Sequence, residues 1–342
     1  MKKILKITLG VLLSIGFLGC GKSELHIYNW PDYIHPDLVE KFEKQYNCKV
    51  TVSTYATLEA LFSDMENKSR EKKYDILFPS TNYARKMYEE NMLRVFDHSK
   101  IPNIKNISKA SIRRSTDSAM RYSVPYMISL TCIAYNKNLV KDFKPSWNMF
   151  ERDDLAGKIG VLDDMREVVG AALKVNSFSY NSTDDNQLRK IGLTLTKWKK
   201  NVGRIDDSEN LEAALKSGGL YLIQDYNGDA LRLSSEDKNI GFAIPEEGTA
   251  INIDSFVIPR EAVNVEAAYK FINFFLDAEV SKDNMEYLLY LAPNLPAQRL
   301  LSDSFRGNVG INPPQSIILK SDYIVELENN SKHDELWRML KR

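Results

Sequence analysis

The chain has 342 residues, of which 43% are apolar and 27% are charged, so it is long enough for two domains and a substantial core. Its 46 basic and 46 acidic residues balance, which excludes the positive field of a nucleic-acid-binding protein. No GxGxxG, GxSxG or HExxH pattern occurs, and the four histidines are scattered. We therefore expect no enzyme, no cofactor and no metal, although a carboxylate-pair glycosidase has no compact motif and stays open at this point.

The first 19 residues have the pattern of a cleavable leader. Three lysines precede an apolar stretch at 7–19, which is too short to span a bilayer. The letters FLGC at 17–20 resemble the cleavage site of a bacterial lipoprotein, in which Cys20 becomes the lipidated N-terminus. A plain secretory signal is the alternative. We expect a periplasmic protein that is anchored to a membrane through Cys20, with a net charge of −3 after removal of the leader lysines.

The first third of the mature chain alternates between strand and helix patterns. Short apolar runs predict strands at 25–30, 48–55 and 74–80, and helical spacing of apolar residues predicts helices at 36–46, 57–72 and 82–93. Because each strand is followed by a helix, we expect a parallel sheet with helices on its faces.

The alternation starts again in the second part of the chain. The patterns predict strands at 158–164, 219–226 and 240–245, and helices from about 165 and at 184–201, 210–218, 265–279, 280–291 and 333–342. Two long apolar runs, 122–136 and 251–259, join the two halves without a Gly/Ser linker, so we expect them to cross between lobes. A cleft between lobes is a common place for a small-molecule site.

These patterns predict an α/β protein of two lobes, each a mixed, mostly parallel sheet flanked by helices, with two crossover strands at a hinge. After the leader at 1–19, we expect lobe 1 from 20–127 plus 254–298 and lobe 2 from 128–253 plus 299–342. Cys48 and Cys132 lie far apart in apolar, strand-like contexts, so two buried thiols are expected, with a disulfide as the alternative.

Four stretches combine acids or aromatic residues with turns and strand ends: YNWPDY at 28–33, PSTNYA at 79–84, VLDDMREVVGAAL at 161–173 and INIDSFVIP at 251–259. In the third, Asp164 and Glu167 lie on one face of a helix start, where they form either a capping box or a pair of ligands. In the fourth, Asp254 interrupts an apolar run, so it either pairs with a buried base or faces the cleft.

Together with YLAPNLPAQRLL at 290–301, these stretches resemble the spermidine/putrescine-binding proteins of bacterial polyamine ABC importers, in order and spacing over 25–340. The resemblance implies a type II periplasmic-binding-protein fold and a monomer that captures putrescine or spermidine. It also implies delivery of the ligand to an ABC permease and its ATPase subunits. The alternatives are a protein of the same fold that binds an amino acid, a sugar or a metal complex, and a surface enzyme or adhesin.

A polyamine is an alkyl chain with ammonium groups, so its site requires carboxylates for the nitrogens and aromatic faces for the methylenes. The resemblance and this chemistry together give eleven expected ligand-binding residues: Trp30, Asp32, Tyr33, Ser80, Tyr83, Asp164, Glu167, Asp207, Tyr226, Asp254 and Tyr290.

The chain departs from the family pattern at several of these places. Asn252 stands where the family usually has Trp, Tyr226 where it commonly has Trp, and Pro31 where a hydroxyl is frequent. Asp207 falls at a usually small, polar position, where it either adds an acid to the site or caps the next helix. These differences leave the ligand class intact and leave the choice between putrescine and spermidine open.

Overall fold

The structure is a computed structural model, and it describes residues 23–67, 73–113, 116–327 and 329–342. The expected leader and Cys20 lie outside the described residues. The strands are β1 (Ser23–Asn29), β2 (Cys48–Thr54), β3 (Ile76–Leu77), β4 (Val124–Asn136), β5 (Ile159–Leu162), β6 (Val202–Asp206), β7 (Leu222–Tyr226), β8 (Ile240–Ala243), β9 (Ala250–Phe256) and β10 (Asp322–Tyr323).

Helices cover most of the remaining chain. The α-helices are α1 (Pro36–Tyr46), α2 (Leu58–Glu66), α3 (Thr81–Glu89), α4 (Lys109–Arg113), α5 (Met165–Val175), α6 (Asp185–Asn201), α7 (Ser208–Lys216), α8 (Asn227–Glu236), α9 (Val265–Phe275), α10 (Ala278–Leu288), α11 (Leu295–Leu300), α12 (Asp303–Arg306), α13 (Gln315–Ile318) and α14 (Ser331–Lys341). Short 3₁₀ turns are η1 (His98–Lys100), η2 (Pro102–Asn106), η3 (Trp147–Glu151) and η4 (Asp153–Leu155). Among the described residues, no helix combines the length and the apolar character that crossing a bilayer requires.

The strands form two sheets. In the first, β2, β1 and β3 lie side by side in that order and are parallel. The second has the order β10-β9-β4-β7-β5-β6, with β8 also paired to β4. In this sheet β4 is antiparallel to β7, β8 and β9, whereas β5 is parallel to β6 and β7, and β10 is parallel to β9.

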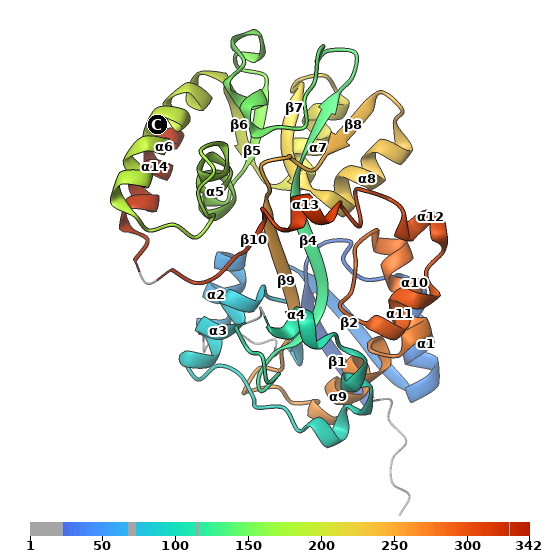
Figure 1. Ribbon diagram of the computed structural model, residues 1–342. Helices are drawn as coiled ribbons and strands as arrows, with labels where there is room; N and C mark the ends of the chain where they lie inside the picture. The colour runs from blue at the N-terminus through green and yellow to red at the C-terminus, as the bar shows by residue number, and fades with distance from the viewer. Residues whose placement is uncertain (1–22, 68–72, 114–115, 328) are drawn as a thin grey trace, which may run out of the picture.

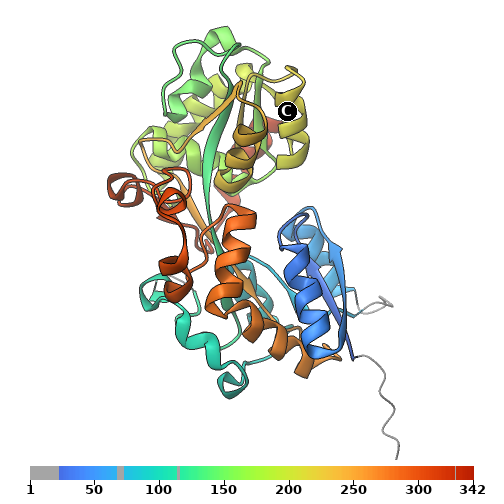
Figure 2. The ribbon, with the colours of Figure 1, turned by 90° about the vertical axis from the view of Figure 1, so that its right-hand side faces the viewer.

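Figure 1 shows two lobes joined by the long strands β4 and β9. We call lobe 1 the part with β1–β3, α1–α3 and α9–α11, and lobe 2 the part with β5–β8, α5–α8 and α14. The lobes stay distinct when the molecule is turned (Figure 2). After α12 the chain passes between the lobes a third time, through α13 and β10, and α14 then packs against α5 and α6.

Each lobe has its own hydrophobic core, and β4 and β9 contribute to both. In β4, Met127 packs into the core of lobe 1 and Leu130 into a core of lobe 2. In β9, Phe256 belongs to lobe 1 and Ile251 to lobe 2. A residue in the middle of either strand therefore lies between the lobes.

The predicted fold class and the alternation of strands and helices are confirmed. β3 is shorter than the predicted strand at 74–80, because the chain turns into α3 directly after Ser80. β6 and α8 are absent from the predicted elements. Cys48 and Cys132 are both buried and unbonded, as expected.

Candidate binding site

Asp254 lies in β9 between the two lobes. Its Oδ2 accepts a hydrogen bond of 2.9 Å from the hydroxyl of Tyr33, and its backbone forms an isolated bridge with Ser80. Only 9% of Asp254 is exposed, and this burial raises the pKa of its carboxyl to about 7, against the effect of the Tyr33 hydrogen bond. No basic residue in the described part of the chain forms an ion pair with Asp254. The carboxylate therefore has no cation of its own.

The neighbours of Asp254 offer a hydroxyl and aromatic rings. Ser80 precedes α3 without capping it, and its buried Oγ has no hydrogen-bond partner. The ring of Tyr33 packs edge-on against Tyr126, with 5.5 Å between centroids, and against Tyr290, at 5.7 Å. These ring contacts hold the Tyr33 hydroxyl toward Asp254. The carboxylate of Asp254, its donor Tyr33 and the unpartnered hydroxyl of Ser80 therefore lie together.

The two acids at the start of α5 have different partners. Asp164 caps the helix by accepting hydrogen bonds from the backbone N–H groups of Arg166 (2.7 Å) and Glu167 (3.2 Å). Glu167 turns instead to the crossover strands, where it accepts from Thr131 (2.5 Å) and Asn252 (2.8 Å). Burial raises the pKa of Glu167 to about 7, and the charge of Asp164 adds to this. The pair is thus one cap and one buried acid rather than a reciprocal capping box.

Asp229, in the first turn of α8, is an acid that the sequence reasoning missed. Its Oδ2 accepts a hydrogen bond of 2.8 Å from the hydroxyl of Tyr290. A Cβ at the preceding Gly228 would lie 2.4 Å from the Tyr290 ring, so only glycine permits this contact. Burial raises the pKa of Asp229, and the charge of the exposed Asp32 adds to this. Asp32 and Asp229 therefore influence one another at the Tyr290 end of the site.

Two further aromatic residues lie beside these acids. Trp30 donates its indole N–H to the carbonyl of Phe78 at 3.2 Å and leaves part of its ring exposed. Tyr226 is half-buried, and its pKa is raised by burial first and then by the charges of Glu167, Asp164 and Asp254. Tyr226 therefore lies between Asp254 and the acids of α5.

The comparisons with known proteins identify the family. Residues 37–309 match the family described as bacterial extracellular solute-binding protein. The chain belongs to this family. It is 31% identical, over 96% of its length and 97% of the other, to the spermidine/putrescine-binding periplasmic protein of Salmonella typhimurium. The structure is similar to that of PotD, the spermidine/putrescine ABC transporter substrate-binding protein of Streptococcus pneumoniae, with a TM-score of 0.82, 29% identity and coverage of 93% and 98%.

A second solved relative is the TpPotD lipoprotein of Treponema pallidum, with a TM-score of 0.81 and 27% identity over 93% of this chain and 99% of that one. The family serves transporters and is not a family of enzymes. Its relative from Salmonella is periplasmic.

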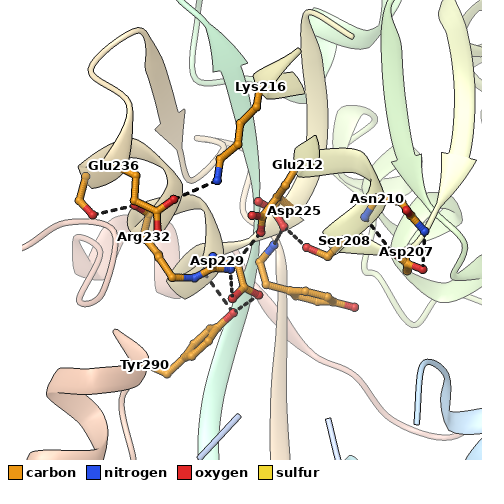
Figure 3. A network of polar contacts seen from close by, with 12 residues as sticks. Asp207, Ser208, Asn210, Glu212, Lys216, Asp225, Asp229, Arg232, Glu236 and Tyr290 are labelled. Atoms are coloured by element: carbon orange, nitrogen blue, oxygen red, sulfur yellow. Dashed lines mark hydrogen bonds and ion pairs between the residues drawn. The ribbon is translucent and has the colours of Figure 1, made fainter. Parts of the chain in front are cut away.

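In this solute-binding protein, two of the expected site residues have other partners. Tyr83 donates its hydroxyl to Glu59 of α2 at 2.5 Å, although Asp164 lies near enough to raise its pKa further after burial and Glu59. Asp207 caps α7, where its two oxygens accept from the backbone and the side chain of Asn210, at 2.8 and 2.9 Å. Figure 3 shows this carboxylate turned toward its own helix.

Asp229, which accepts the hydrogen bond from Tyr290, forms a cluster of three acids with Glu212 and Asp225 (Figure 3). One ligand oxygen from each of these acids lies within 4.8 Å of the others, which is close enough to hold a cation. Arg232 already contacts Glu212 and Asp229, both at 3.3 Å. The guanidinium therefore supplies positive charge to this network, and the expectation of no metal stays a prediction.

The site thus combines carboxylates at three places, of which Asp254 and Glu167 are buried and Asp229 is partly exposed, with aromatic rings between them. The charge of such a site is met by a ligand that brings several positive groups on an apolar body, because a desolvated carboxylate gains most from a charge-assisted hydrogen bond.

Proposed function

We propose that this protein captures polyamines, putrescine or spermidine, between its two lobes and delivers them to a membrane permease driven by ATPase subunits. The observation that carries the proposal is Asp254, a buried carboxylate between the lobes with a hydroxyl donor and no cation. Leaving a charge in this state costs free energy, and an ammonium group of the ligand would remove that cost.

The basic residues near the acids favour a cationic ligand over an amino acid. An amino acid would require a free cation for its carboxylate. Arg166 instead donates to the carbonyl of Val325 (2.7 Å) and to Asn181 (2.8 Å). Arg232, the other arginine among these acids, contacts Glu212 and Asp229. Both guanidinium groups therefore already have oxygen partners within the protein, which favours a ligand without a carboxylate.

In the proposed complex, the three ammonium groups of spermidine bind to the acids at the three places described above, and the two of putrescine bind at Asp254 and at the acids of α5. Asp254 takes the central position, Asp164 and Glu167 form one end, and Asp32 and Asp229 form the other. These acids come from both lobes and from β9, so a ligand that contacts them all would hold the lobes together. We also propose β4 and β9 as the hinge, with the lobe boundaries expected within them at 127/128 and 253/254, and with the last boundary moved from 298/299 to the end of α11.

The aromatic residues line the alkyl chain in this proposal. Trp30 and Tyr226 are partly exposed and gain apolar burial against methylenes. A ring that faces an ammonium adds roughly 0.5–2 kcal/mol of cation–π attraction, and this contribution is also open to the buried rings of Tyr33 and Tyr290. Ser80 offers its unpartnered hydroxyl as a further contact. Tyr83 lies at the edge of the set, and Asp207 is left out because Asn210 occupies both of its oxygens.

The cellular setting follows from the leader and from the relatives. We propose that Cys20 carries lipid and that the mature protein works as a tethered monomer on the periplasmic side of a membrane. One of the solved relatives is itself a lipoprotein. Radiolabelled palmitate incorporated into the wild-type chain and absent from a Cys20→Ala variant would support the anchor, and label retained by the variant would refute it.

A thermal-shift panel tests the ligand class. Putrescine, spermidine and spermine are compared with neutral amino acids, sugars and divalent cations, all on ligand-free protein at pH 8. A ligand present at a hundredfold excess over its Kd stabilises the folded state by about 2.7 kcal/mol, which corresponds to several degrees in Tm. We expect a shift from polyamines alone. A shift from a sugar or an amino acid, and none from any polyamine, would overturn the proposal.

A further inference from the structure

Two side chains on the same face of β9, those of Asn252 and Asp254, link the acids of the two lobes. Asn252 and Asp254 are two residues apart, so their side chains leave the strand on the same side, roughly 7 Å from one another. Asp254 reaches Tyr33 of lobe 1, whereas Asn252 reaches Glu167 of lobe 2. The family resemblance leads us to expect an aromatic ring at position 252, and this chain has an amide there.

The amide of Asn252 takes part in a defined arrangement around Glu167. Asn252 donates to Oε1 at 2.8 Å and Thr131 donates to Oε2 at 2.5 Å. The backbone carbonyl of Glu167 accepts from the side chains of Gln224 (3.0 Å) and Tyr180 (3.3 Å). Only 3% of Glu167 is exposed. Both ends of the residue are therefore fixed, and each carboxylate oxygen keeps a lone pair for another donor.

We propose that Asn252 is a positioning residue for ligand binding, which holds the Glu167 carboxylate in place and in its charged form so that it can receive an ammonium group. This inference rests on the proposed function. In it, the amide replaces the stacking ring of the family with a hydrogen bond that acts through Glu167. Affinity at the α5 end of the site then depends on a residue whose own side chain carries no charge.

The groups around Glu167 determine the direction of the effect. Burial and the charge of Asp164 raise the pKa of Glu167, and the hydrogen bonds from Thr131 and Asn252 and the charge of Arg166 lower it. Tyr180 and Tyr226 also face it and stay protonated, since burial raises the pKa of each well above its usual value. Without the Asn252 donor, one of the contacts that lower the pKa of Glu167 is lost, so burial and the charge of Asp164 raise this pKa further. Glu167 then takes up a proton at higher pH and loses its attraction for an ammonium.

The test is an Asn252→Leu variant, which keeps the approximate size of the side chain and removes the donor. A hydrogen bond to a charged group is worth enough to move a pKa by about one unit. We expect the pH midpoint of putrescine binding, measured by calorimetry between pH 5.5 and 8.5, to rise by about one unit. Near pH 7 the ionised fraction of Glu167 falls from about one half to about one eleventh, so the Kd should rise roughly fivefold, and the difference should shrink toward pH 8.5.

Three further variants separate positioning from a general change in packing. Ser129→Ala alters the residue directly opposite Asn252 in the pairing of β4 with β9, and should leave the pH midpoint unchanged. Asn252→Gln keeps an amide donor and should restore part of the wild-type profile. In a Glu167→Gln background, Asn252→Leu should change the Kd by less than about twofold, because the group through which it acts is gone.

A measurement without ligand keeps this inference distinct from the proposed function. Carboxyl ¹³C NMR of Glu167, assigned by its loss in Glu167→Gln, reports the pKa directly, and we expect Asn252→Leu to raise it by about one unit. An unchanged pKa, or a pH midpoint shift that persists in Glu167→Gln, would overturn the role of Asn252. If no polyamine binds to the wild-type protein, the proposed function fails, and the NMR titration still decides whether Asn252 holds Glu167.

Discussion

Replacing Asp254 with Asn tests the acid on which the account depends most. The substitution keeps the shape of the side chain and removes its charge. Removing one partner of a buried, hydrogen-bonded charge pair costs about 2–5 kcal/mol of binding free energy. Asp254 is 9% exposed and lies between the lobes, so it falls within this class. We therefore expect calorimetry at pH 8 to give a putrescine Kd raised by about 30-fold to several-thousand-fold.

The same change should stabilise the protein when no ligand is bound. Burial raises the pKa of Asp254 from 3.8 to about 7, so ionisation costs the folded state up to about 4 kcal/mol relative to the unfolded chain. This cost is absent below the unfolded pKa and complete above pH 7. At pH 8, Asp254→Asn should raise the free energy of unfolding of the ligand-free protein by an amount up to this value.

Asp184→Asn is the matched control, because Asp184 is an exposed N-cap of α6 and Asn caps nearly as well. It should leave both affinity and stability unchanged. The reasoning is refuted if Asp254→Asn binds putrescine within threefold of the wild type, or if it lowers the stability of the ligand-free protein at pH 8.

The remaining predictions concern pH, one donor and two glycines. Burial raises the pKa of the two site acids Glu167 and Asp254 to about 7. As the pH drops from 8 to 5, polyamine affinity measured by calorimetry should therefore fall, while the free energy of unfolding of the ligand-free protein, measured by urea titration, should rise. Affinity and stability that change in the same direction would contradict this. Tyr33→Phe removes the donor to Asp254 and should raise the Kd roughly tenfold at pH 7 by calorimetry, and an unchanged Kd would contradict it. Gly170→Ala, despite its better helix propensity, should cost about 1–3 kcal/mol in urea unfolding, because the new Cβ would lie 1.9 Å from a ring atom of Tyr180. Gly192→Ala, with its nearest neighbour at 3.5 Å, should instead stabilise by about 1 kcal/mol, and equal effects of the two changes would refute the packing argument.

Much of the architecture could be predicted from the sequence, because apolar periodicity survives in most elements. Helices such as α1 and α9 carry clear 3.6-residue patterns, and β4 is a single apolar run. β6 was not predicted because it is short, contains Gly203 and has no buried residue, so it lacks both alternation and an apolar run.

The site was predictable where an acid contradicts its local context. Asp254 interrupts an apolar strand, and that conflict indicates a function before any contact is known. Asp229 gave no such signal. It follows Asn227 and Gly228, a pair typical of a turn, although α8 in fact starts at Asn227, with the ring of Tyr290 packed against the glycine. That contact joins residues about sixty positions apart, so no local pattern contains it.

Local patterns also left two alternatives open that only tertiary contacts could decide. Asp164 and Glu167 have the spacing of a capping box, and half of that motif is present, since Asp164 caps α5. Glu167 does not complete the capping box, because its carboxylate accepts hydrogen bonds from Thr131 of β4 and Asn252 of β9 instead. For Asp207 the local alternative is the correct one: it caps α7, and its partner Asn210 lies within the same turn.

A crystal structure of the protein with spermidine tests the central claim most directly. The account predicts continuous density between the lobes, with one nitrogen within hydrogen-bond distance of Asp254, a second at Glu167, and methylenes against Tyr226. Density for spermidine elsewhere on the protein, or between the lobes without a nitrogen at Asp254, would contradict it.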